Sequence, residues 1–255
     1  MQKTDYQIYY NMNNKPIYIY TRFSIPFINK PWSNQIDRLY NFKNQTTNDK
    51  YLSFLFNSNR LNNKFFMFEN ITVPTIVSQK YENFLWIIFI SSLLPNLYKD
   101  RLKTILSKYD QTTNLIELNG FINTVDLINS HTPQDKEYIS IRIDDDDGLP
   151  QNYFTIVNDQ IKNYDIIGMN NRLLLSKDNQ EVIHYTKEKT NHLLSCGLSC
   201  QNSHILSMGN HMKAHEKYTS LFLDQTCLMS CGDFTLTKRH EQFTNQIFNL
   251  DTYYS

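Results

Sequence analysis

Glycine is scarce in this chain, which has only 6 among its 255 residues. The Gly-rich loops that cradle phosphate, such as the Walker loop and the G-x-G-x-x-G turn, do not occur, so nucleotide binding by that route is not expected. An excess of positive charge is also missing, because 25 Lys and Arg residues balance 25 Asp and Glu residues. Nucleic-acid binders usually carry a basic face for the phosphates, so we expect no nucleic-acid partner.

Long hydrophobic runs are lacking as well. The longest apolar stretch, residues 84–94, falls well short of the roughly 20 residues that a membrane-spanning helix needs. The polar first ten residues have neither the basic patch nor the apolar centre of a signal peptide. We therefore expect a cytoplasmic protein without a transmembrane segment, and leave peripheral contact with the inner membrane open.

Cysteine is sparse and occurs in two C-x3-C pairs, Cys196 with Cys200 and Cys227 with Cys231. This spacing is compatible with a four-thiolate zinc site. Disulfides are not the first interpretation for a chain without a secretion signal, and a chain of this length needs no metal to stabilise its fold. Buried free cysteines are the favoured interpretation, and the zinc site is the alternative.

Apolar residues, at 40% of the chain, are sufficient for a sizeable core. Runs of β-branched and aromatic residues predict strands over residues 17–22, 84–91, 114–118 and 138–143, and a β-hairpin over 165–175 and 181–185. Helical periodicity predicts helices over 65–79, 95–109 and 153–161. In the second of these, the apolar residues expected to point inward are Leu97, Leu102, Ile105 and Leu106. Residues 29–63 resemble a polar loop, with some helix around 36–42.

This alternation of strands and helices predicts an α/β fold, a mostly parallel central sheet with helices on both faces. The hairpin and a variable C-terminal lobe complete it. The sequence has no internal repeat and no Pro- or Ser-rich linker, so we expect one domain over residues 1–255. Its nucleotide half would span about 15–165, and its acceptor or C-terminal lobe about 166–255.

Four successive carboxylates, Asp144 to Asp147, follow the strand predicted at 138–143. Like charges so close together oppose ionisation unless a cation neutralises them. Oxygen ligands suit hard divalent cations, and open α/β sheets bind ligands at the carboxyl ends of their strands. We therefore predict Mg²⁺ or Mn²⁺ here, holding a diphosphate. The alternative interpretation is a solvated acidic turn closed by Gly148 and Pro150.

The segment 141–150, Ile-Arg-Ile-Asp-Asp-Asp-Asp-Gly-Leu-Pro, resembles the Asp-x-Asp-Asp signature of glycosyltransferases with the GT-A fold. More narrowly, residues 18–153 are similar to a bacterial family of rhamnosyltransferases. Three further pieces carry this resemblance: Thr21-Arg22-Phe23, then Phe68-Glu69-Asn70 with Val73-Pro74-Thr75-Ile76 and Gln79, and Phe84-Leu85-Trp86-Ile87-Ile88-Phe89. In one departure, Ser91-Ser92 stand where many GT-A enzymes carry an acidic residue that contacts the nucleobase.

The resemblance implies a GT-A-like fold and a metal-dependent transfer of a sugar from a nucleoside-diphosphate donor. Its implied nucleotide-sugar contacts are Thr21, Arg22, Phe23, Arg142, Asp144 and Asp145. Its implied metal ligands are Asp144, Asp146 and Asp147. The implied donor is a nucleotide sugar such as dTDP-rhamnose, and the acceptor a saccharide or glycolipid of the bacterial surface. Strand alternation points Arg142 to the same side as Asp144, although a structural ion pair would explain it equally well.

Catalysis by inversion requires a general base for the acceptor hydroxyl. In GT-A enzymes this base usually lies well beyond the acidic motif, and the candidates here are Glu216, which is preferred, and Asp224, with Asp233 less favoured. His211 and His215 have the i, i+4 spacing that places two imidazoles on one helix face. They are therefore further candidate metal ligands, with surface histidines as the alternative, and His240 is a weaker one.

Two other functions compete with the glycosyltransferase. A nucleotidyl- or phosphotransferase could use the same acidic cluster, but it should need a basic triphosphate loop that the sequence lacks. A non-catalytic protein could bind Ca²⁺ or a basic partner through the aspartates. The pattern Thr21-Arg22-Phe23 at a strand end favours the transferase over the cation-binding protein, because a plain Ca²⁺ module needs no α/β nucleotide half.

Overall fold

The structure is a computed structural model that describes residues 14–29, 47–178, 181–191, 193–194, 196–208, 211–230 and 246–247. Its strands are β1 (Ile17–Arg22), β2 (Phe84–Ser91), β3 (Thr113–Leu118), β4 (Ile139–Arg142), β5 (Ile166–Asp178), β6 (Glu181–Lys189), β7 (Leu198–Gln201), β8 (Ser220–Ser230) and β9 (Gln246–Ile247). Its α-helices are α3 (Asn48–Leu55), α4 (Ser58–Met67), α5 (Val73–Val77), α6 (Asn96–Leu106), α7 (Thr124–Ser130) and α8 (Tyr153–Gln160). Shorter helical turns are η1 (Phe68–Thr72), η2 (Ser107–Tyr109), η3 (Ile161–Asn163), η4 (Ile205–Met208) and η5 (His211–Glu216).

The described strands form one sheet in the order β3-β2-β1-β4-β7-β5-β6-β9, and β8 pairs with β5. Strands β3, β2, β1 and β4 are parallel to one another, whereas β7 runs antiparallel to β4. The chain moves outward from β1 to β2 and β3, and then returns to place β4 on the other side of β1. The strand order therefore reverses between β1 and β4, which is where open α/β sheets form their ligand crevice.

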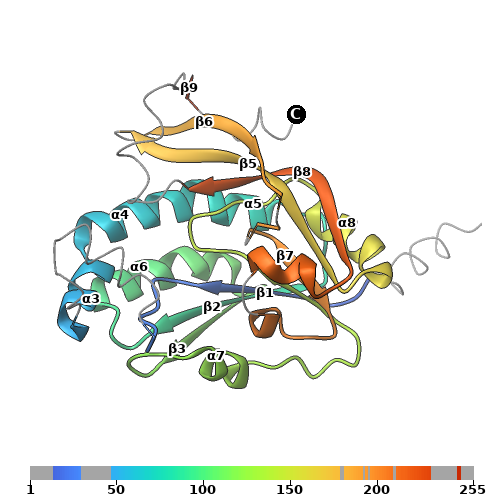
Figure 1. Cartoon of the computed structure of the whole chain (residues 1–255). Helices are drawn as coiled ribbons and strands as arrows, with labels where there is room; N and C mark the ends of the chain where they lie inside the picture. Colours follow the sequence, from blue (N-terminus) through green and yellow to red (C-terminus); the bar gives the residue numbers. More distant parts are fainter. Residues whose placement is uncertain are drawn as a thin grey trace, which may run out of the picture.

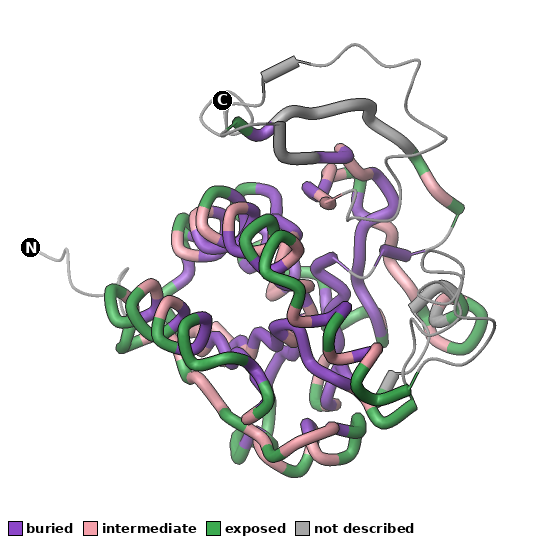
Figure 2. The backbone as a smooth tube through the Cα atoms, turned by 90° about the vertical axis from the view of Figure 1, so that its left-hand side faces the viewer, coloured by how far each residue is buried: buried purple, intermediate pink, exposed green. Residues whose placement is uncertain are grey.

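Helices cover both faces of the parallel strands (Figure 1). On one face, Ile19, Trp86 and Ile141 pack with side chains of α4 and α6 such as Phe65 and Leu102. On the other face, side chains that alternate with these along the strands pack against α7 and η4. Because both faces are covered, β1 and β2 are apolar along most of their length. Figure 2 shows the buried strands between helices whose outer sides are exposed.

One continuous helical segment runs from α4 through η1 into α5. It begins after Asn57, whose side-chain oxygen accepts hydrogen bonds from the backbone N–H groups of Asn59 and Arg60. The middle part, η1, is a single π-helical turn, and Pro74 follows it in the first turn of α5. The proline has no backbone N–H to donate, so the regular hydrogen-bond pattern is interrupted at this junction. Leu61 and Phe65, on the inner side of α4, are fully buried. Their packing fixes the helix over the edge where β1 and β4 end.

The β5–β6 hairpin and the end of β8 fold back over this helical segment (Figure 1). Met67 and Ile71 pack there against Leu175, Val182 and Leu228. Leu228 also exchanges two backbone hydrogen bonds with Gly148, with N···O distances of 2.8 and 2.9 Å. The loop that follows β4 therefore passes between α4–η1–α5 and the end of β8.

The predicted α/β class is confirmed, with the parallel strands, the helices on both faces and the hairpin. The predicted strands at 17–22, 84–91, 114–118 and 138–143 correspond to β1, β2, β3 and β4, and the predicted helices at 95–109 and 153–161 to α6 with η2 and to α8 with η3. The division into a nucleotide half and an acceptor lobe stays a prediction.

Two expectations need correction, and one lies outside the described residues. Residues 47–63 are not a polar loop, because Tyr51, Phe54 and Leu55 give α3 a buried face within a polar sequence, and α4 begins at Ser58. The helix expected near 36–42 lies outside the described residues. Leu97 does not point inward but is 75% exposed. The neighbouring Tyr98 takes the buried position in the first turn of α6.

Candidate functional site

The acidic run lies at the point where the strand order reverses. In the β1–β4 pair Tyr20 is opposite Arg142, and the N–H of Ile143 still donates to the carbonyl of Tyr20 at 3.2 Å. The chain then leaves the sheet as Asp144, on the level at which β1 ends in Arg22. Parallel strands bring their carboxyl ends to one edge, so the end of β1 and the acidic run share one site.

Asp144 is held by two arginines, one from each strand. Its Oδ1 accepts from Nη2 of Arg22 at 3.1 Å and from Nη2 of Arg142 at 3.3 Å. Burial acts to raise the pKa of Asp144, but Arg142 and Arg22 outweigh it and hold that pKa well below the usual range. Burial and the neighbouring Arg142 lower the pKa of Arg22. Two cations thus share one carboxylate oxygen, which leaves a local excess of positive charge.

Asp145 is almost completely buried, with 3% of its surface exposed. Its Oδ2 accepts from the backbone N–H of Ser24 at 3.1 Å, and its Oδ1 accepts from Nζ of Lys64 at 2.5 Å. Ser24 has a φ of 47°, a left-handed conformation that is uncommon outside glycine. The hydrogen bond to Asp145 fixes this turn, which directs the chain away from the end of β1.

Asp146 and Asp147 differ in their access to solvent. The Asp146 side chain is 17% exposed, and its Oδ2 accepts from Lys64 at 3.2 Å. Asp147 is 3% exposed, and its Oδ1 accepts from the backbone N–H of Ser230 at 3.3 Å. Burial raises the pKa of Asp146, and burial together with Asp146 and Asp144 raises the pKa of Asp147 well above its usual range.

Thr21 and Phe23, which were predicted to line the nucleotide pocket, lie in the core. Thr21 is fully buried, and its hydroxyl accepts from Nε1 of Trp86 at 3.0 Å. Phe23 is also fully buried, with ring centroids of Phe65 and Phe68 at 4.8 and 5.3 Å. These contacts fix the end of β1, and Arg22 between them is the side chain of the three that reaches the acidic run.

Asp224 and Glu216, the predicted bases, are both exposed, the Asp224 side chain to 97%. Asp224 precedes Ser230 by six residues in β8, which corresponds to roughly 20 Å along an extended strand. Glu216 lies in η5, before β8 begins. The length of β8 separates Asp224 from the acidic run, and the catalytic role of both residues stays a prediction. Asp233, the third candidate, lies outside the described residues.

His215 packs its ring against Phe222, with centroids 5.9 Å apart. Phe222 precedes Ser230 by eight residues, roughly 25 Å of strand, so the structure does not bring His215 and Asp147 together. The side chain of His211 and the whole of His240 lie outside the described residues, and the histidine ligands stay a prediction.

Cys196, Cys200 and Cys227 are buried and free, as favoured from the sequence, and Cys231 lies outside the described residues. The Cys196 and Cys227 thiols share one core cluster, whereas Cys200 belongs to the cluster on the opposite face and contacts the Ser140 hydroxyl at 3.1 Å. Because the first C-x3-C pair is divided between two faces of the sheet, it does not assemble a zinc site.

The donor set determines which kind of cation the acidic run can hold. Asp145 and Asp147 are buried away from solvent, whereas the side chains of Asp144 and Asp146 are 31% and 17% exposed. Within the described ranges, no group of three His, Cys, Asp or Glu side chains is arranged to hold an ion. Mg²⁺ commonly uses one or two carboxylates together with substrate phosphates. The residues therefore fit a cation that arrives with a diphosphate, held by Asp144 and Asp146.

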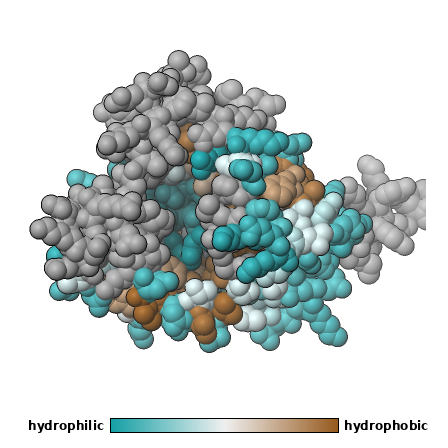
Figure 3. Space-filling model, in the orientation of Figure 1, coloured by the Kyte–Doolittle hydropathy of each residue, from teal (hydrophilic) through white to brown (hydrophobic). Residues whose placement is uncertain are grey.

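Sequence reasoning missed Lys64, Ser24 and Ser230. Lys64 stands at the boundary between the segment taken for a loop and the predicted helix at 65–79, so nothing marked it as facing the aspartates. Ser24 and Ser230 contact the aspartates through their backbone N–H groups, which leave no signal in side-chain chemistry. Figure 3 shows a hydrophilic hollow left of centre, in the part of the molecule where β1 ends in Figure 1.

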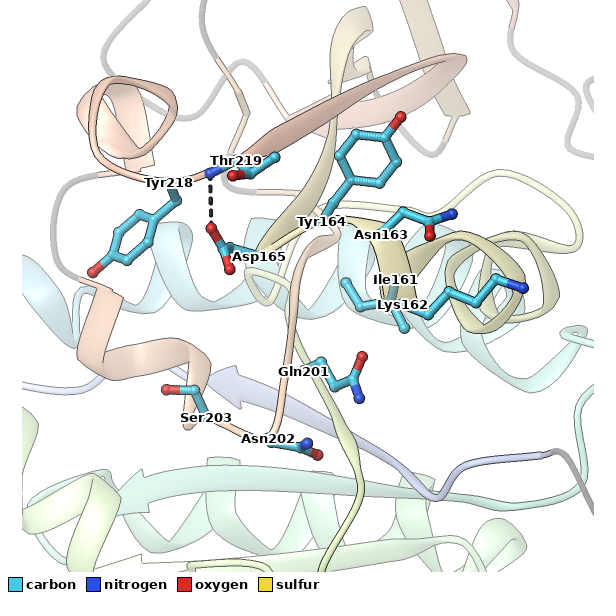
Figure 4. A pocket seen from close by; sticks show the side chains of 10 residues that line it. All are labelled: Ile161, Lys162, Asn163, Tyr164, Asp165, Gln201, Asn202, Ser203, Tyr218 and Thr219. Carbon is cyan, nitrogen blue, oxygen red and sulfur yellow. Dashed lines mark hydrogen bonds between the residues drawn. The ribbon is translucent and has the colours of Figure 1, made fainter.

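A separate pocket of about 510 Å³ lies at the other end of the sheet (Figure 4). Its wall includes Asp165, whose Oδ2 accepts from the backbone N–H of Thr219 at 2.9 Å, and Gln201 of β7. Gln201 pairs with Ile139, the first residue of β4, whereas the acidic run follows the last. The pocket contains no residue that was predicted for the site.

The sequence of this chain matches the profile of a known protein family. The sequence profile of the family described as "Putative rhamnosyl transferase" matches residues 19–219. No curated protein is detectably similar in sequence to this chain.

Several solved structures are similar in fold, among them two enzymes. One is 4-diphosphocytidyl-2C-methyl-D-erythritol synthase from Anaerococcus prevotii, with 11% identity, a TM-score of 0.44 and coverage of 83% of this chain and 87% of that one. The other is a mannosyltransferase from Pyrobaculum calidifontis in complex with GDP-Man and Mn²⁺, with 8% identity and a TM-score of 0.47. That match covers 89% of this chain but only 58% of the mannosyltransferase. Likenesses this distant do not bear on function.

Proposed function

Because this chain belongs to the family of putative rhamnosyl transferases, we propose that it moves a sugar from a nucleoside-diphosphate donor to a saccharide acceptor at the carboxyl ends of β1 and β4. The family membership confirms the predicted enzyme class, a glycosyltransferase. One observation carries the location of the site: Arg22, Arg142 and the aspartate run meet where the strand order reverses.

The charges at this edge suit a diphosphate. Arg22 and Arg142 share Oδ1 of Asp144, so two positive charges face one carboxylate. The Nε of Arg142 is buried and has no hydrogen-bond partner among the described residues. Guanidinium groups offer several donors in a planar fork that suits phosphate oxygens. We assign the donor's phosphates to these two arginines.

A divalent cation, Mn²⁺ or Mg²⁺, belongs to the proposal as the partner of the diphosphate. Asp144 and Asp146 would hold it, because they keep exposed carboxylate surface. When bound, it would act as a Lewis acid and stabilise the charge that develops on the leaving nucleoside diphosphate. Asp145 and Asp147 position the loop, through Ser24 and Ser230 respectively.

The family name supports rhamnose as the sugar, and the acceptor is proposed from the general chemistry of sugar transfer. We propose dTDP-rhamnose as the donor and a saccharide or glycolipid of the bacterial surface as the acceptor. The described residues include no helix with the length and apolar character needed to cross a bilayer. Contact with the inner membrane, where a glycolipid acceptor would lie, stays part of the proposal.

Glu216 and Asp224 stay the proposed bases for the acceptor hydroxyl. A general base contributes about 10²- to 10⁴-fold to the rate. Glu216→Gln should therefore lower kcat by at least about 100-fold and leave donor binding unchanged. If Asp224 is the base instead, Asp224→Asn should have this effect. If both variants keep the wild-type kcat, the base lies elsewhere.

A thermal-shift panel tests donor binding. The panel contains UDP, GDP, dTDP and CMP, each with Mn²⁺ or with EDTA. A ligand at 100 times its Kd stabilises the folded state by about 2.7 kcal/mol, which raises the Tm of a chain of this size by about 5–10 °C. We expect one nucleotide to give this shift only with Mn²⁺. Asp146→Ala should abolish it, and Asp100→Ala, which removes an exposed carboxylate on α6, should not.

The same assay, extended to nucleoside triphosphates and to Ca²⁺ without nucleotide, separates the competing functions. A shift with nucleoside triphosphates alone would favour a nucleotidyl- or phosphotransferase. A shift with Ca²⁺ and no nucleotide would favour a cation-binding protein. Either result would contradict the proposed donor site.

A further inference from the structure

Lys64 is a third cation at the acidic run, and it comes from neither strand. It lies in the last turn of α4, and its Nζ donates to Oδ1 of Asp145 at 2.5 Å and to Oδ2 of Asp146 at 3.2 Å. Its side chain is 16% exposed. One ammonium group thus bridges two adjacent carboxylates, in the manner expected of a metal ion between two aspartates.

The position of Lys64 is fixed by the packing of its helix. Leu61 and Phe65, on either side of it in the sequence, are fully buried against the sheet. Phe65 contacts Phe23 and Tyr98, with ring centroids 4.8 and 5.7 Å away. The backbone of α4 cannot retreat from the acidic run without opening this core, so a competing cation can only displace the flexible end of the Lys64 side chain.

Three carboxylates of the run are already paired with cations of the protein. Asp144 pairs with Arg22 and Arg142, and Asp145 and Asp146 pair with Lys64. Asp147 accepts instead from a backbone N–H of β8. Three protein cations therefore face Asp144, Asp145 and Asp146, and these groups need no further charge to be neutral as a set.

We propose that Lys64 is a built-in counter-ion that keeps a divalent cation off the acidic run until the cation arrives with a nucleoside diphosphate. The inference rests on the proposed function and adds the order of binding. A free Mn²⁺ must displace Lys64 from Asp146 and adds two positive charges to a neutral set. With the diphosphate present, the added charges cancel, and the displaced ammonium gains a phosphate oxygen as its new partner.

Thermodynamic linkage makes this order measurable. If the nucleotide raises the affinity for Mn²⁺ by a given factor, Mn²⁺ raises the affinity for the nucleotide by the same factor. We expect that factor to be tenfold or more, within the range of ordinary coupling between sites. Removal of Lys64 should shrink it, because Mn²⁺ then reaches Asp146 without displacing an ammonium group.

The experiment is a titration of Mn²⁺ into the full chain, with free Mn²⁺ followed by electron paramagnetic resonance, first alone and then with UDP, GDP or dTDP. The variants are Lys64→Met and the double variant Lys64→Met with Asp145→Asn. The double variant serves if the single variant fails to fold, because it also removes the buried Asp145 carboxylate that would have lost its lysine partner. The matched control is Lys99→Met. Lys99 is a buried lysine of α6 whose Nζ pairs with Oε1 of Glu117 at 2.7 Å.

Wild type and Lys99→Met should bind Mn²⁺ alone only weakly, and both Lys64 variants should bind it at least about tenfold more tightly. Equal affinity for Mn²⁺ alone in the wild type and the Lys64 variants would overturn the proposal. So would a wild type that binds Mn²⁺ as tightly without nucleotide as with it. If no nucleotide binds under any condition, the proposed function fails, while the variants with Mn²⁺ alone still decide the role of Lys64.

Discussion

Gly148 and Gly197 are tightly packed beside the segment that follows the aspartates, and their replacement by alanine tests this packing. A Cβ on Gly148, directly after the aspartates, would lie 2.8 Å from Cγ2 of Ile71, 3.1 Å from Cγ2 of Thr75 and 3.2 Å from Cβ of Leu228. These neighbours belong to η1, α5 and β8. Overpacking of this kind costs about 1–3 kcal/mol, so we expect Gly148→Ala to lower the Tm by roughly 2–10 °C.

Gly197 combines crowding with backbone strain. Its φ is +69°, and an added Cβ would lie 2.8 Å from Cε of Met169 and 2.9 Å from Cδ2 of Leu149. A left-handed conformation adds about 1–2 kcal/mol for a residue with a Cβ, so Gly197→Ala should be more destabilising than Gly148→Ala. Gly120, with a φ of +66° and no atom within 4 Å of its added Cβ, isolates the strain alone.

Calorimetry of the three alanine variants checks this order. We expect the loss of stability to be greatest for Gly197→Ala, and expect Gly148→Ala alone to weaken nucleotide binding beyond its effect on Tm, because it moves the aspartates. A Tm of Gly148→Ala within a degree of the wild type would refute the packing described for this loop. So would an effect of Gly120→Ala as large as that of Gly197→Ala.

Three further predictions concern single buried contacts. Burial lowers the pKa of His204 to about 4, so the unfolded chain binds a proton at this histidine more readily than the folded chain does. The free energy of unfolding should therefore fall by up to about 3 kcal/mol as the pH drops from 6.5 to 4. Thermal melts of His204→Phe should show a flatter pH dependence. Thr21→Val leaves the buried Trp86 indole N–H without its acceptor and should cost about 1–3 kcal/mol by urea denaturation. Asp145→Ala removes one of the two carboxylates that pair with Lys64 and the acceptor of the Ser24 N–H, and should cost about 1–3 kcal/mol. Glu69→Ala, which breaks a half-exposed pair with Arg101, should cost less than about 1 kcal/mol; equal costs would contradict the burial of Lys64.

The parallel half of the fold could be predicted because its local signals agree. The residues of β2 are apolar almost throughout, as a strand covered on both faces requires, and the helical segment that leads into α5 has regular apolar spacing. The acidic run could be placed at a strand end for a similar reason: Ile139, Ile141 and Ile143 mark a strand, and the aspartates follow it directly.

Apart from the β5–β6 hairpin, the second half could not be predicted, because its other strands are defined by partners far away in the sequence. β7 is only four residues long and pairs with β4 about 60 residues earlier, and β8 pairs with β5 in parallel. Short or half-polar segments of this kind carry little periodicity of their own. The contacts of Lys64 were hidden likewise, since a lysine on a helix surface is ordinary until the structure shows which carboxylates it faces.

The measurement that tests the central claim most directly is phosphorus NMR of the purified chain with dTDP-rhamnose and other nucleotide sugars, Mn²⁺ and a saccharide acceptor. The account predicts release of a nucleoside diphosphate from one donor, in amounts equal to the sugar transferred, and loss of that release in Asp146→Ala. It would be contradicted by pyrophosphate released from a nucleoside triphosphate. It would also be contradicted by turnover that is unchanged in Asp146→Ala.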